Sequence, residues 1–272
     1  MVILLLITVL TLLVAMADDF IKSDLIDGFQ QVFTFHGHKL HVRGFAVVEW
    51  TNDRTIISDD GSATGDANTT RRHSKEIYLS WDTKQLLIWE RNRRESNPRI
   101  LKFVKFNQPN FICSATPISK PKFKIQVVLA AALDMSFKVY DRNLNLIESI
   151  KHEERAILQL VFDSSRDIVL SSGAAGIVLW KFYKNSISDT NHIMERLVTF
   201  ESCKYWVTKM IYEPQFERIY VMNDRTVKVY NITRQTLQAE IINAHQAPVT
   251  AACWFARNQF YITGCRLVYF EA

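Results

Sequence analysis

Histidines are the first candidates for chemistry in this sequence, because three of them fall within six residues. His36, His38 and His41 carry imidazole nitrogens, which are common metal ligands. On a strand His36 and His38 would share one face, but no Cys, Asp or Glu stands beside them to complete a ligand set. We therefore predict no metal site here and interpret these residues as histidines of a corner or a strand edge.

The other groups that could do chemistry also fail to form a recognised set. Residues 58–66, within the polar segment 51–75, lack the Gly-Lys-Ser/Thr end of a phosphate loop and the alternating ligands of a calcium loop. No CxxC pair occurs among the four cysteines, Cys113, Cys203, Cys253 and Cys265. No paired carboxylates or Ser/His/Asp arrangement stands out. The sequence thus predicts a protein that is not an enzyme and needs no cofactor.

Charge provides a further candidate site. The chain has 33 Lys and Arg against 28 Asp and Glu, a formal net charge of +5. This modest excess argues against nucleic acid as a partner. Basic residues cluster at Arg71, Arg72, Arg91, Arg93 and Arg94. We interpret this cluster mainly as solvated loop charge; the alternative is a patch for an anionic partner such as an acidic protein surface, a phosphoinositide or nucleic acid.

The N-terminal segment has a different composition from the rest of the chain. Residues 2–17 are sixteen residues without a charge, and Asp18 and Asp19 follow them. A membrane-spanning helix needs about 20 apolar residues, whereas Ala15 and Ala17 have the small-x-small spacing of a signal-peptide cleavage site. Two hypotheses stay open for residues 1–17: a signal or membrane anchor, or a gene-model or fragment start that exposes an apolar strand which is normally buried. Residues 18–32 are a lead-in.

The elements that must position all these residues repeat along the chain. Five segments each contain a turn with a small residue or Asp, then an alternating strand, then an aromatic residue. These aromatic residues follow one another at intervals of 40 to 51 positions: Trp89, Tyr140, Trp180, Tyr230 and Phe270. The turn residue is Asp82, Asp134 or Asp224 in three segments, and Ala174 and Gly264 take its place in the other two. The pattern predicts five similar units.

Short strands account for each unit. The runs are four to eight residues long, rich in β-branched and aromatic residues, and bounded by turn residues. No stretch after Asp19 has a helical period of useful length, and all six Pro fall in predicted turns. The sequence therefore predicts an all-β domain over residues 33–272. Its units cover about 33–90, 98–141, 143–184, 193–232 and 236–272.

These units resemble those of the WD-repeat (WD40) family, which run from a Gly-His corner to a Trp-Asp end. The corner matches are Ala244-His245, His152, and Gly37-His38 before the first unit. No unit ends in Trp-Asp; the ends are Trp-Glu, Tyr-Asp, Trp-Lys, Tyr-Asn and Phe-Glu. The resemblance implies a β-propeller of about five blade units. It also implies that a corner His, His152 or His245, hydrogen-bonds a turn Asp, as at Asp134 or Asp224.

Five units are fewer than the family's usual seven or eight, and an open arc would expose sheet edges. Three explanations stay open: a fragment of a longer chain, which we favour, a five-bladed closure, or an arc completed by other chains. The resemblance implies a non-enzymatic scaffold that docks other proteins. The end LSSGAAGIVLWKF of one unit is similar to WD-repeat proteins linked to cilia and flagella, which implies the cytoplasm. The alternative is a secreted or membrane-tethered ligand-binding ectodomain.

Overall fold

Strands account for all the regular structure in the described part of the computed structural model. The described residues are 34–48, 75–92, 97–120, 125–152, 156–182, 194–200, 206–255 and 260–265; they form eighteen strands and no helix. The all-β prediction is therefore confirmed. The N-terminal residues 1–17, the lead-in, and Arg71, Arg72, Arg93 and Arg94 lie outside the described residues.

The strands form five small antiparallel sheets in chain order. The first sheet contains β1 (Gly44–Val48), β2 (Lys75–Trp81), β3 (Gln85–Asn92) and β4 (Arg99–Lys105). The second contains β5 (Ile112–Lys120), β6 (Ile125–Ala132), β7 (Ser136–Tyr140) and β8 (Leu146–Lys151). The third contains β9 (Ile157–Asp163), β10 (Ile168–Gly173), β11 (Gly176–Phe182) and β12 (Met194–Thr199). The fourth contains β13 (Val207–Glu213), β14 (Arg218–Asn223), β15 (Thr226–Asn231) and β16 (Thr236–Ile241), and the fifth contains β17 (Val249–Phe255) and β18 (Phe260–Cys265).

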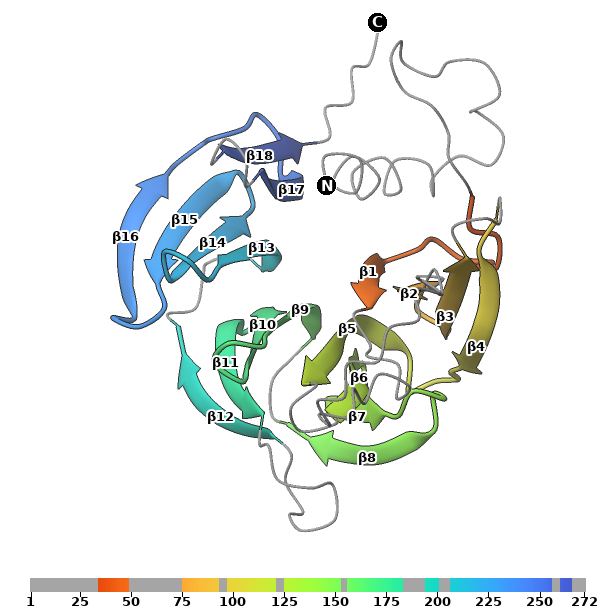
Figure 1. The fold of residues 1–272 in the computed structure, drawn as a ribbon. Helices are drawn as coiled ribbons and strands as arrows, with labels where there is room; N and C mark the ends of the chain where they lie inside the picture. Colours follow the sequence, from red (N-terminus) through yellow and green to blue (C-terminus); the bar gives the residue numbers. More distant parts are fainter. Residues whose placement is uncertain are drawn as a thin grey trace, which may run out of the picture.

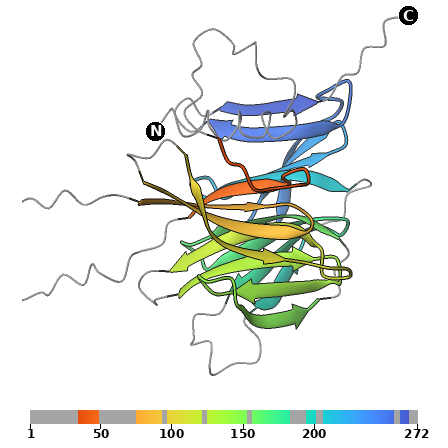
Figure 2. The same ribbon diagram turned by 90° about the vertical axis from the view of Figure 1, so that its right-hand side faces the viewer.

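The five sheets follow one another around a common centre (Figure 1). In each four-stranded sheet the first strand lies nearest the centre and the fourth lies outermost. Seen from the side, the strands of successive sheets run in similar directions (Figure 2). Their connecting turns therefore gather on two opposite sides of the molecule.

The outer strands show that the sheets are offset from the sequence units. The unit predicted over 98–141 begins with β4, yet β4 pairs with β3 in the first sheet. In the same way β8, β12 and β16 each close the sheet that precedes them in the chain. Each unit thus gives its opening strand to the sheet before it, which joins neighbouring sheets covalently and by hydrogen bonds.

The composition of the strands follows this layout. The middle strands β6 and β10 are buried at nearly every position, because each sheet packs on both faces and both faces must be apolar. The outer strands β4 and β16 are exposed at almost every position. An apolar cluster lies between each pair of successive sheets, from the first and second to the fourth and fifth. In each cluster, side chains of one sheet pack on side chains of the next.

Gly173, at the end of β10, provides a test of how closely successive segments approach. A Cβ at Gly173 would lie 2.1 Å from the carbonyl oxygen of Ala156, and this oxygen also accepts a hydrogen bond from Ala174 N–H at 3.1 Å. We expect Gly173→Ala to lower the free energy of unfolding by about 2–3 kcal/mol, because backbone must move to make room. Urea unfolding followed by tryptophan fluorescence measures the change.

Gly264→Ala is the matched control for this substitution. A Cβ at Gly264, on β18, would meet the Cβ of Ala251 at 3.9 Å, which is ordinary contact. Its effect should stay within about 0.5 kcal/mol. Equal losses in the two variants would contradict the close approach at Gly173.

Candidate functional site

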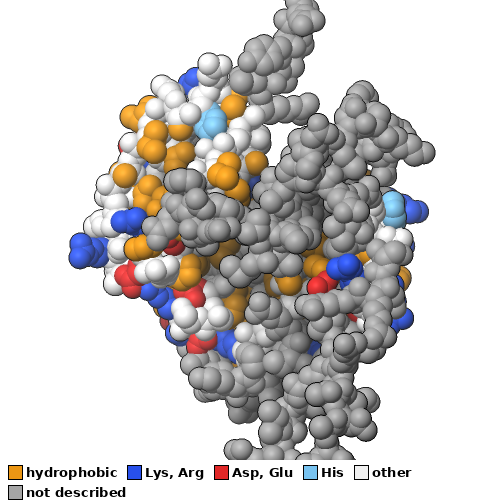
Figure 3. Space-filling model, turned by 45° about the horizontal axis from the view of Figure 1, so that its top comes forward, with side chains coloured by type: hydrophobic (Ala, Val, Ile, Leu, Met, Phe, Trp, Pro, Cys, Tyr) orange, Lys and Arg blue, Asp and Glu red, His pale blue; other side chains and the backbone are white. Residues whose placement is uncertain are grey.

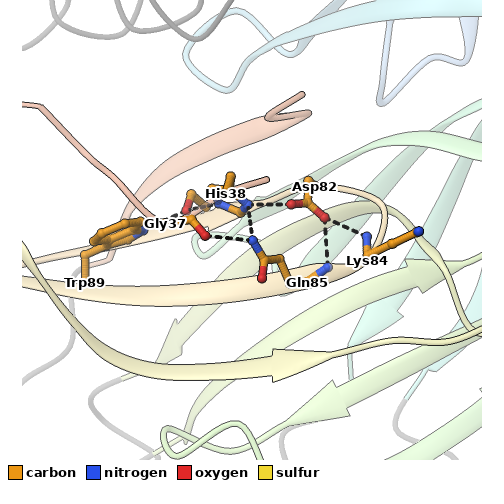
Figure 4. Close-up of polar contacts among 7 residues, drawn as sticks. Gly37, His38, Asp82, Lys84, Gln85 and Trp89 are labelled. Atoms are coloured by element: carbon orange, nitrogen blue, oxygen red, sulfur yellow. Dashed lines mark hydrogen bonds and ion pairs between the residues drawn. The ribbon is translucent and has the colours of Figure 1, made fainter. Parts of the chain in front are cut away.

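A chain of hydrogen bonds at the first sheet forms the best-defined polar site in the described residues. His38 Nδ1 lies 2.7 Å from Asp82 Oδ2, and His38 Nε2 lies 2.7 Å from Ser80 Oγ (Figure 4). The indole Nε1–H of Trp89 donates to the same Ser80 Oγ at 2.7 Å. This series of hydrogen bonds therefore connects the turn after β2, the segment before β1 and the middle of β3. We call these four residues the His38 brace.

Local sequence explains why the brace forms here. Asp82 begins the turn between β2 and β3, and its Oδ1 accepts hydrogen bonds from the backbone N–H groups of Lys84 at 2.6 Å and Gln85 at 2.9 Å. This is the turn-capping behaviour expected of Asp. Gly37 lies against the Trp89 ring, where a Cβ would come within 2.7 Å of it. A glycine before His38 thus lets the backbone pass over Trp89 and bring the imidazole to Asp82.

The order Asp82–His38–Ser80 matches the hydrogen-bond pattern of a Ser-His-Asp catalytic set. The environment of the serine differs from that of a nucleophile, however. Ser80 is 2% exposed, and its oxygen already accepts the Trp89 indole N–H. A nucleophile needs a free path to its substrate. This arrangement is therefore suited to holding three segments together.

Half of the brace recurs in the third sheet. The indole Nε1–H of Trp180 donates to Ser171 Oγ at 2.8 Å, with the same nine-residue separation as Trp89 and Ser80. Gly173 stands two positions after Ser171, where Asp82 stands after Ser80. The imidazole of His152 packs on Phe137 and Trp180, with ring centroids 4.5 and 6.1 Å apart. Here tilted and edge-to-face ring contacts of the histidine stand where the first sheet has the contact between His38 and Asp82.

Trp89 and Trp180 give a direct test of the two indole hydrogen bonds. We expect Trp89→Phe and Trp180→Phe to lower the free energy of unfolding by similar amounts, about 1–2 kcal/mol each, because each leaves a buried serine hydroxyl without its donor. Trp206→Phe is the control, since Trp206 is 55% exposed. Thermal unfolding followed by circular dichroism compares the three variants. A larger loss at Trp206 than at the two buried tryptophans would contradict the assignment.

The remaining predicted brace residues have other partners. His245 Nε2 lies 2.7 Å from Thr263 Oγ1 on β18, and this contact resembles that of His38 with Ser80. Asp134 accepts the Ser136 hydroxyl at 2.5 Å and lies 3.4 Å from Lys138 Nζ. Burial raises the pKa of Asp134, but the Ser136 hydroxyl and Lys138 outweigh this and hold the pKa below its usual value. Asp224 lies 3.8 Å from its neighbour Arg225.

The third-strand aromatic residues have one role in common. Tyr140 on β7, Trp180 on β11 and Tyr230 on β15 each belong to the cluster between their own sheet and the preceding one. Trp89 on β3 has the corresponding place in the first sheet, in a cluster with Tyr78 and Leu87. The repeated aromatic found in the sequence therefore marks the same structural position four times. Phe270 lies outside the described residues.

Arg91 is the member of the predicted basic cluster that the structure describes. Its Nη1 lies 2.9 Å from Glu76 Oε2, the oxygen that also accepts the Tyr78 hydroxyl at 2.7 Å. Burial and the Glu76 carboxylate raise the pKa of Tyr78 to about 12. Arg91 thus belongs to a local polar cluster on the first sheet. The structure does not test whether the other four arginines form a patch with it, because they lie outside the described residues.

Polar side chains also join neighbouring sheets near the centre. Ser114 Oγ on β5 accepts Leu160 N–H from β9 at 3.1 Å, and Gln159 makes two hydrogen bonds with the backbone of Met210 at 2.8 and 2.9 Å. Thr208 Oγ1 on β13 donates to Val249 O on β17 at 3.2 Å. The inner strands of the second, third and fourth sheets are therefore each tied to the next inner strand by a side-chain hydrogen bond. We call these contacts the inner rungs.

Buried acids add a second set of links between the later sheets. The Tyr212 hydroxyl of the fourth sheet donates to Asp163 Oδ2 of the third at 2.6 Å. The Tyr261 hydroxyl of the fifth sheet donates to Glu213 of the fourth. Burial raises the pKa of Asp163, but the hydroxyls of Ser165 and Tyr212 and the backbone of Ser165 hold it below its usual value. These carboxylates thus act as acceptors between sheets.

One side of the molecule carries exposed apolar residues, and it is opposite to the strand ends that hold Asp163 and Glu213. The turns between second and third strands all lie on this side, because the sheets share one topology. The turns lie close to the start of the next sheet, as Ile112 N–H bonds Thr83 O at 3.0 Å and Val249 N–H bonds Asp224 O at 2.8 Å. Leu133 and Met135 in one turn are 52% and 50% exposed, and Trp206 just before β13 is 55% exposed. We call this side, with Leu133, Met135 and Trp206, the turn side.

Metal-ligating groups and membrane-spanning helices were sought among the described residues. In them no group of three or more His, Cys, Asp and Glu side chains is placed to hold a metal ion. Likewise, the described chain contains no helix of the length and apolarity needed to cross a bilayer. No family model matches the chain, and no curated protein matches it either.

Proposed function

We propose that the five sheets are blades of a WD-repeat β-propeller and that the protein is a non-enzymatic scaffold that docks other proteins. The observation that carries the proposal is the repeated place of Trp89, Tyr140, Trp180 and Tyr230, each on the third strand of its sheet. Sheets of one strand order around one centre (Figure 1) are what a propeller requires. The His38 brace supports the family resemblance, because in that family a corner His bonds a turn Asp.

The proposed mechanism is rigid presentation of loops. Buried clusters and inner rungs fix the sheets to one another, so the turns that they carry have fixed relative positions. Turns with fixed positions suit partner binding, because little conformational entropy is lost when a partner binds to them. The family resemblance also supports a place in a cytoplasmic multiprotein assembly.

The turn side is the docking face that the exposed residues favour. Trp and Met are enriched at protein interfaces, and a few large anchors carry most binding energy. Trp206, Leu133 and Met135 supply such anchors on the same side of the molecule, Leu133 and Met135 in the second sheet and Trp206 at the start of the fourth. Apolar side chains also occur elsewhere on the surface, including the left-hand part of Figure 3, so a matched comparison between surfaces is needed.

Quantitative affinity purification with two variants tests the proposal. The first carries Leu133→Ser, Met135→Asn and Trp206→Ser on the turn side; asparagine suits Met135 because its φ is 57°. The control carries Leu146→Ser, Phe216→Ser and Leu237→Ser, which are exposed elsewhere. We expect the turn-side variant to lose at least one stoichiometric partner about tenfold or more, while the control retains it.

Two outcomes would overturn the proposal. If both variants bound the same partners, the turn side would not be the docking face. If the unmodified chain bound no stoichiometric partner, the scaffold function would be wrong. Thermal unfolding of each variant, compared with the unmodified chain, separates lost binding from lost folding.

A further inference from the structure

The inner strands of the second to fifth sheets share one irregularity, a β-bulge near the start of the strand. The register of pairing with the second strand shifts by one residue in β5, β9, β13 and β17. The first residue past the shift is, in chain order, Ser114, Gln159, Lys209 and Ala251. Ser114 and Gln159 are the side chains that make the inner rungs of the second and third sheets. We call this place in each inner strand the rung position.

A side chain at the rung position has a constant target in the next sheet. The rung residue of the second sheet accepts a hydrogen bond from Leu160 N–H at 3.1 Å. Gln159, the rung residue of the third sheet, accepts Met210 N–H at 2.8 Å and donates to Met210 O at 2.9 Å. Each target is the residue directly after the rung position of its own strand. By the same rule, Lys209 of the fourth sheet is directed at Ala252 of the fifth.

The other residues of the same strand face confirm this direction. Lys209, Ile211 and Glu213 alternate along β13, so their side chains lie on one face of the strand. Ile211 packs on the cluster that contains Val249 of the fifth sheet, and Glu213 accepts the hydroxyl of Tyr261 from the same sheet. The face that carries Lys209 is therefore the one that the fifth sheet covers. Glu213 lies four residues along the strand, roughly 13 Å away, which is too far for an ion pair with Lys209.

Lysine is the wrong residue for an ordinary rung. Its ammonium has three donors and no acceptor, so Lys209 cannot accept an N–H as Gln159 does. Burial lowers the pKa of Lys209, and no carboxylate or hydrogen-bond acceptor of the described residues opposes that effect. The hydrogen bond between these two sheets comes instead from the preceding residue, Thr208, whose hydroxyl donates to Val249 O at 3.2 Å. Lys209 therefore brings a half-buried positive charge to this joint, and such a charge is favourable only when it is paired.

Small residues form the fifth-sheet side of this contact. Ala251 holds the rung position of β17 and is exposed, and Ala252 beside it is half-buried. The residue that pairs with Ala251 on β18 is Gly264, which has no side chain. Short side chains leave room for a small ligand between the ammonium of Lys209 and the backbone of Ala252.

We propose that Lys209 and the backbone N–H of Ala252 bind a carboxylate, which completes the row of inner rungs. One carboxylate oxygen would accept the N–H of Ala252, as the side-chain oxygen of Gln159 accepts that of Met210. The other oxygen would accept the ammonium of Lys209, and charge-assisted hydrogen bonds of this kind are short and strong. The carboxylate is that of a small molecule or that of an acidic side chain on a docked protein. The site itself does not depend on the scaffold function, because a free carboxylate would also fill it.

Nuclear magnetic resonance of the full chain with labelled lysine ε-carbons tests the proposal. The Lys209 signal is the one missing from Lys209→Gln and from Lys209→Arg. Sodium acetate replaces sodium chloride at constant ionic strength, and we expect a saturable shift of the Lys209 signal while the Lys228 signal stays in place. Lys228 is the control because it lies 3.5 Å from Glu240 on the surface. A blocked Gly-Glu-Gly peptide, with its Gly-Gln-Gly counterpart as control, is the second probe. Binding of acetate alone would indicate a small molecule, and binding of the Glu peptide would indicate a protein side chain.

Thermal unfolding provides a second measurement on the same proteins. Acetate at ten times its Kd should raise the midpoint of the unmodified chain by roughly 3 °C. Lys209→Arg, which keeps the positive charge, should retain this rise, whereas Lys209→Gln should lose it and have a higher midpoint in chloride, because its amide can bond Ala252 as Gln159 bonds Met210. If neither probe moved the Lys209 signal, the proposal would be wrong. Equal shifts at Lys209 and Lys228 would show an adventitious ion only and would also contradict it.

Discussion

Asp82→Ala is expected to lower the free energy of unfolding by about 3 kcal/mol, because it removes a buried acceptor of three hydrogen bonds. Asp82 is 1% exposed, and its carboxylate binds His38 Nδ1 and the backbone N–H groups of Lys84 and Gln85. The substitution would free the turn between β2 and β3 and release the segment before β1. Urea unfolding measures the change, and the midpoint of thermal unfolding should fall by roughly 6–12 °C.

Asparagine provides the matched comparison. Asp82→Asn keeps the size of the side chain and one acceptor for the turn, but it removes the charged contact with His38, so we expect an intermediate loss. Asp224→Asn is the control, because Asp224 is a turn aspartate with a side chain 30% exposed and a φ of 53°, which asparagine tolerates. If the two asparagine variants were equally stable, the His38 brace would have no special role.

The second large effect is expected at the joint between the second and third sheets. Lys120 Nζ on β5 lies 2.7 Å from Asp167 Oδ1, with side chains 3% and 9% exposed. The same ammonium lies 3.4 Å from Phe182 O and 5.0–5.5 Å from the centres of the Phe182 and Phe162 rings. Lys120→Ala would leave the Asp167 carboxylate buried without its main cation. We expect a loss of about 3–5 kcal/mol in urea unfolding.

A double variant separates charge from packing at this joint. Lys120→Met with Asp167→Asn removes both charges, keeps most of the volume and suits the positive φ of residue 167, which is 59°. It should recover most of the stability that Lys120→Ala loses. Lys228→Ala is the surface control, since Lys228 and Glu240 lie 3.5 Å apart with side chains 26% and 35% exposed, and its loss should stay below about 1 kcal/mol. Equal losses for Lys120→Ala and Lys228→Ala would contradict the buried-pair argument.

Local patterns in the sequence were enough to predict strands and the repeated aromatic. Alternation and turn residues identify β3, β7, β11 and β15, because these features depend on near neighbours in the chain. Local patterns could not show which sheet each outer strand joins. The composition of β4 is that of any short strand, and its pairing with β3 depends on contacts between two sequence units.

The brace illustrates where sequence reasoning stops. We expected the hydrogen-bonded corner histidine to be His152 or His245, as the family resemblance implied, but the His–Asp hydrogen bond joins His38 and Asp82, which are 44 residues apart. The segment 49–74 intervenes and hides the spacing of the first unit. A usable signal was nevertheless present, since serine stands nine residues before tryptophan in both Ser80–Trp89 and Ser171–Trp180. The Lys120–Asp167 pair had no such signal, because it forms between separate sheets.

The inner rungs have a consequence for how this molecule unfolds. Because Ser114, Gln159 and Thr208 each tie one inner strand to the next, stability is transmitted between nearest neighbours, as in a one-dimensional cooperative array. Among the described strands the fifth sheet contributes only two, and it contacts a neighbour on one side. Under gradual denaturation the array should therefore fray inward from β17 and β18, and amide protons there should exchange before those of β6 and β10.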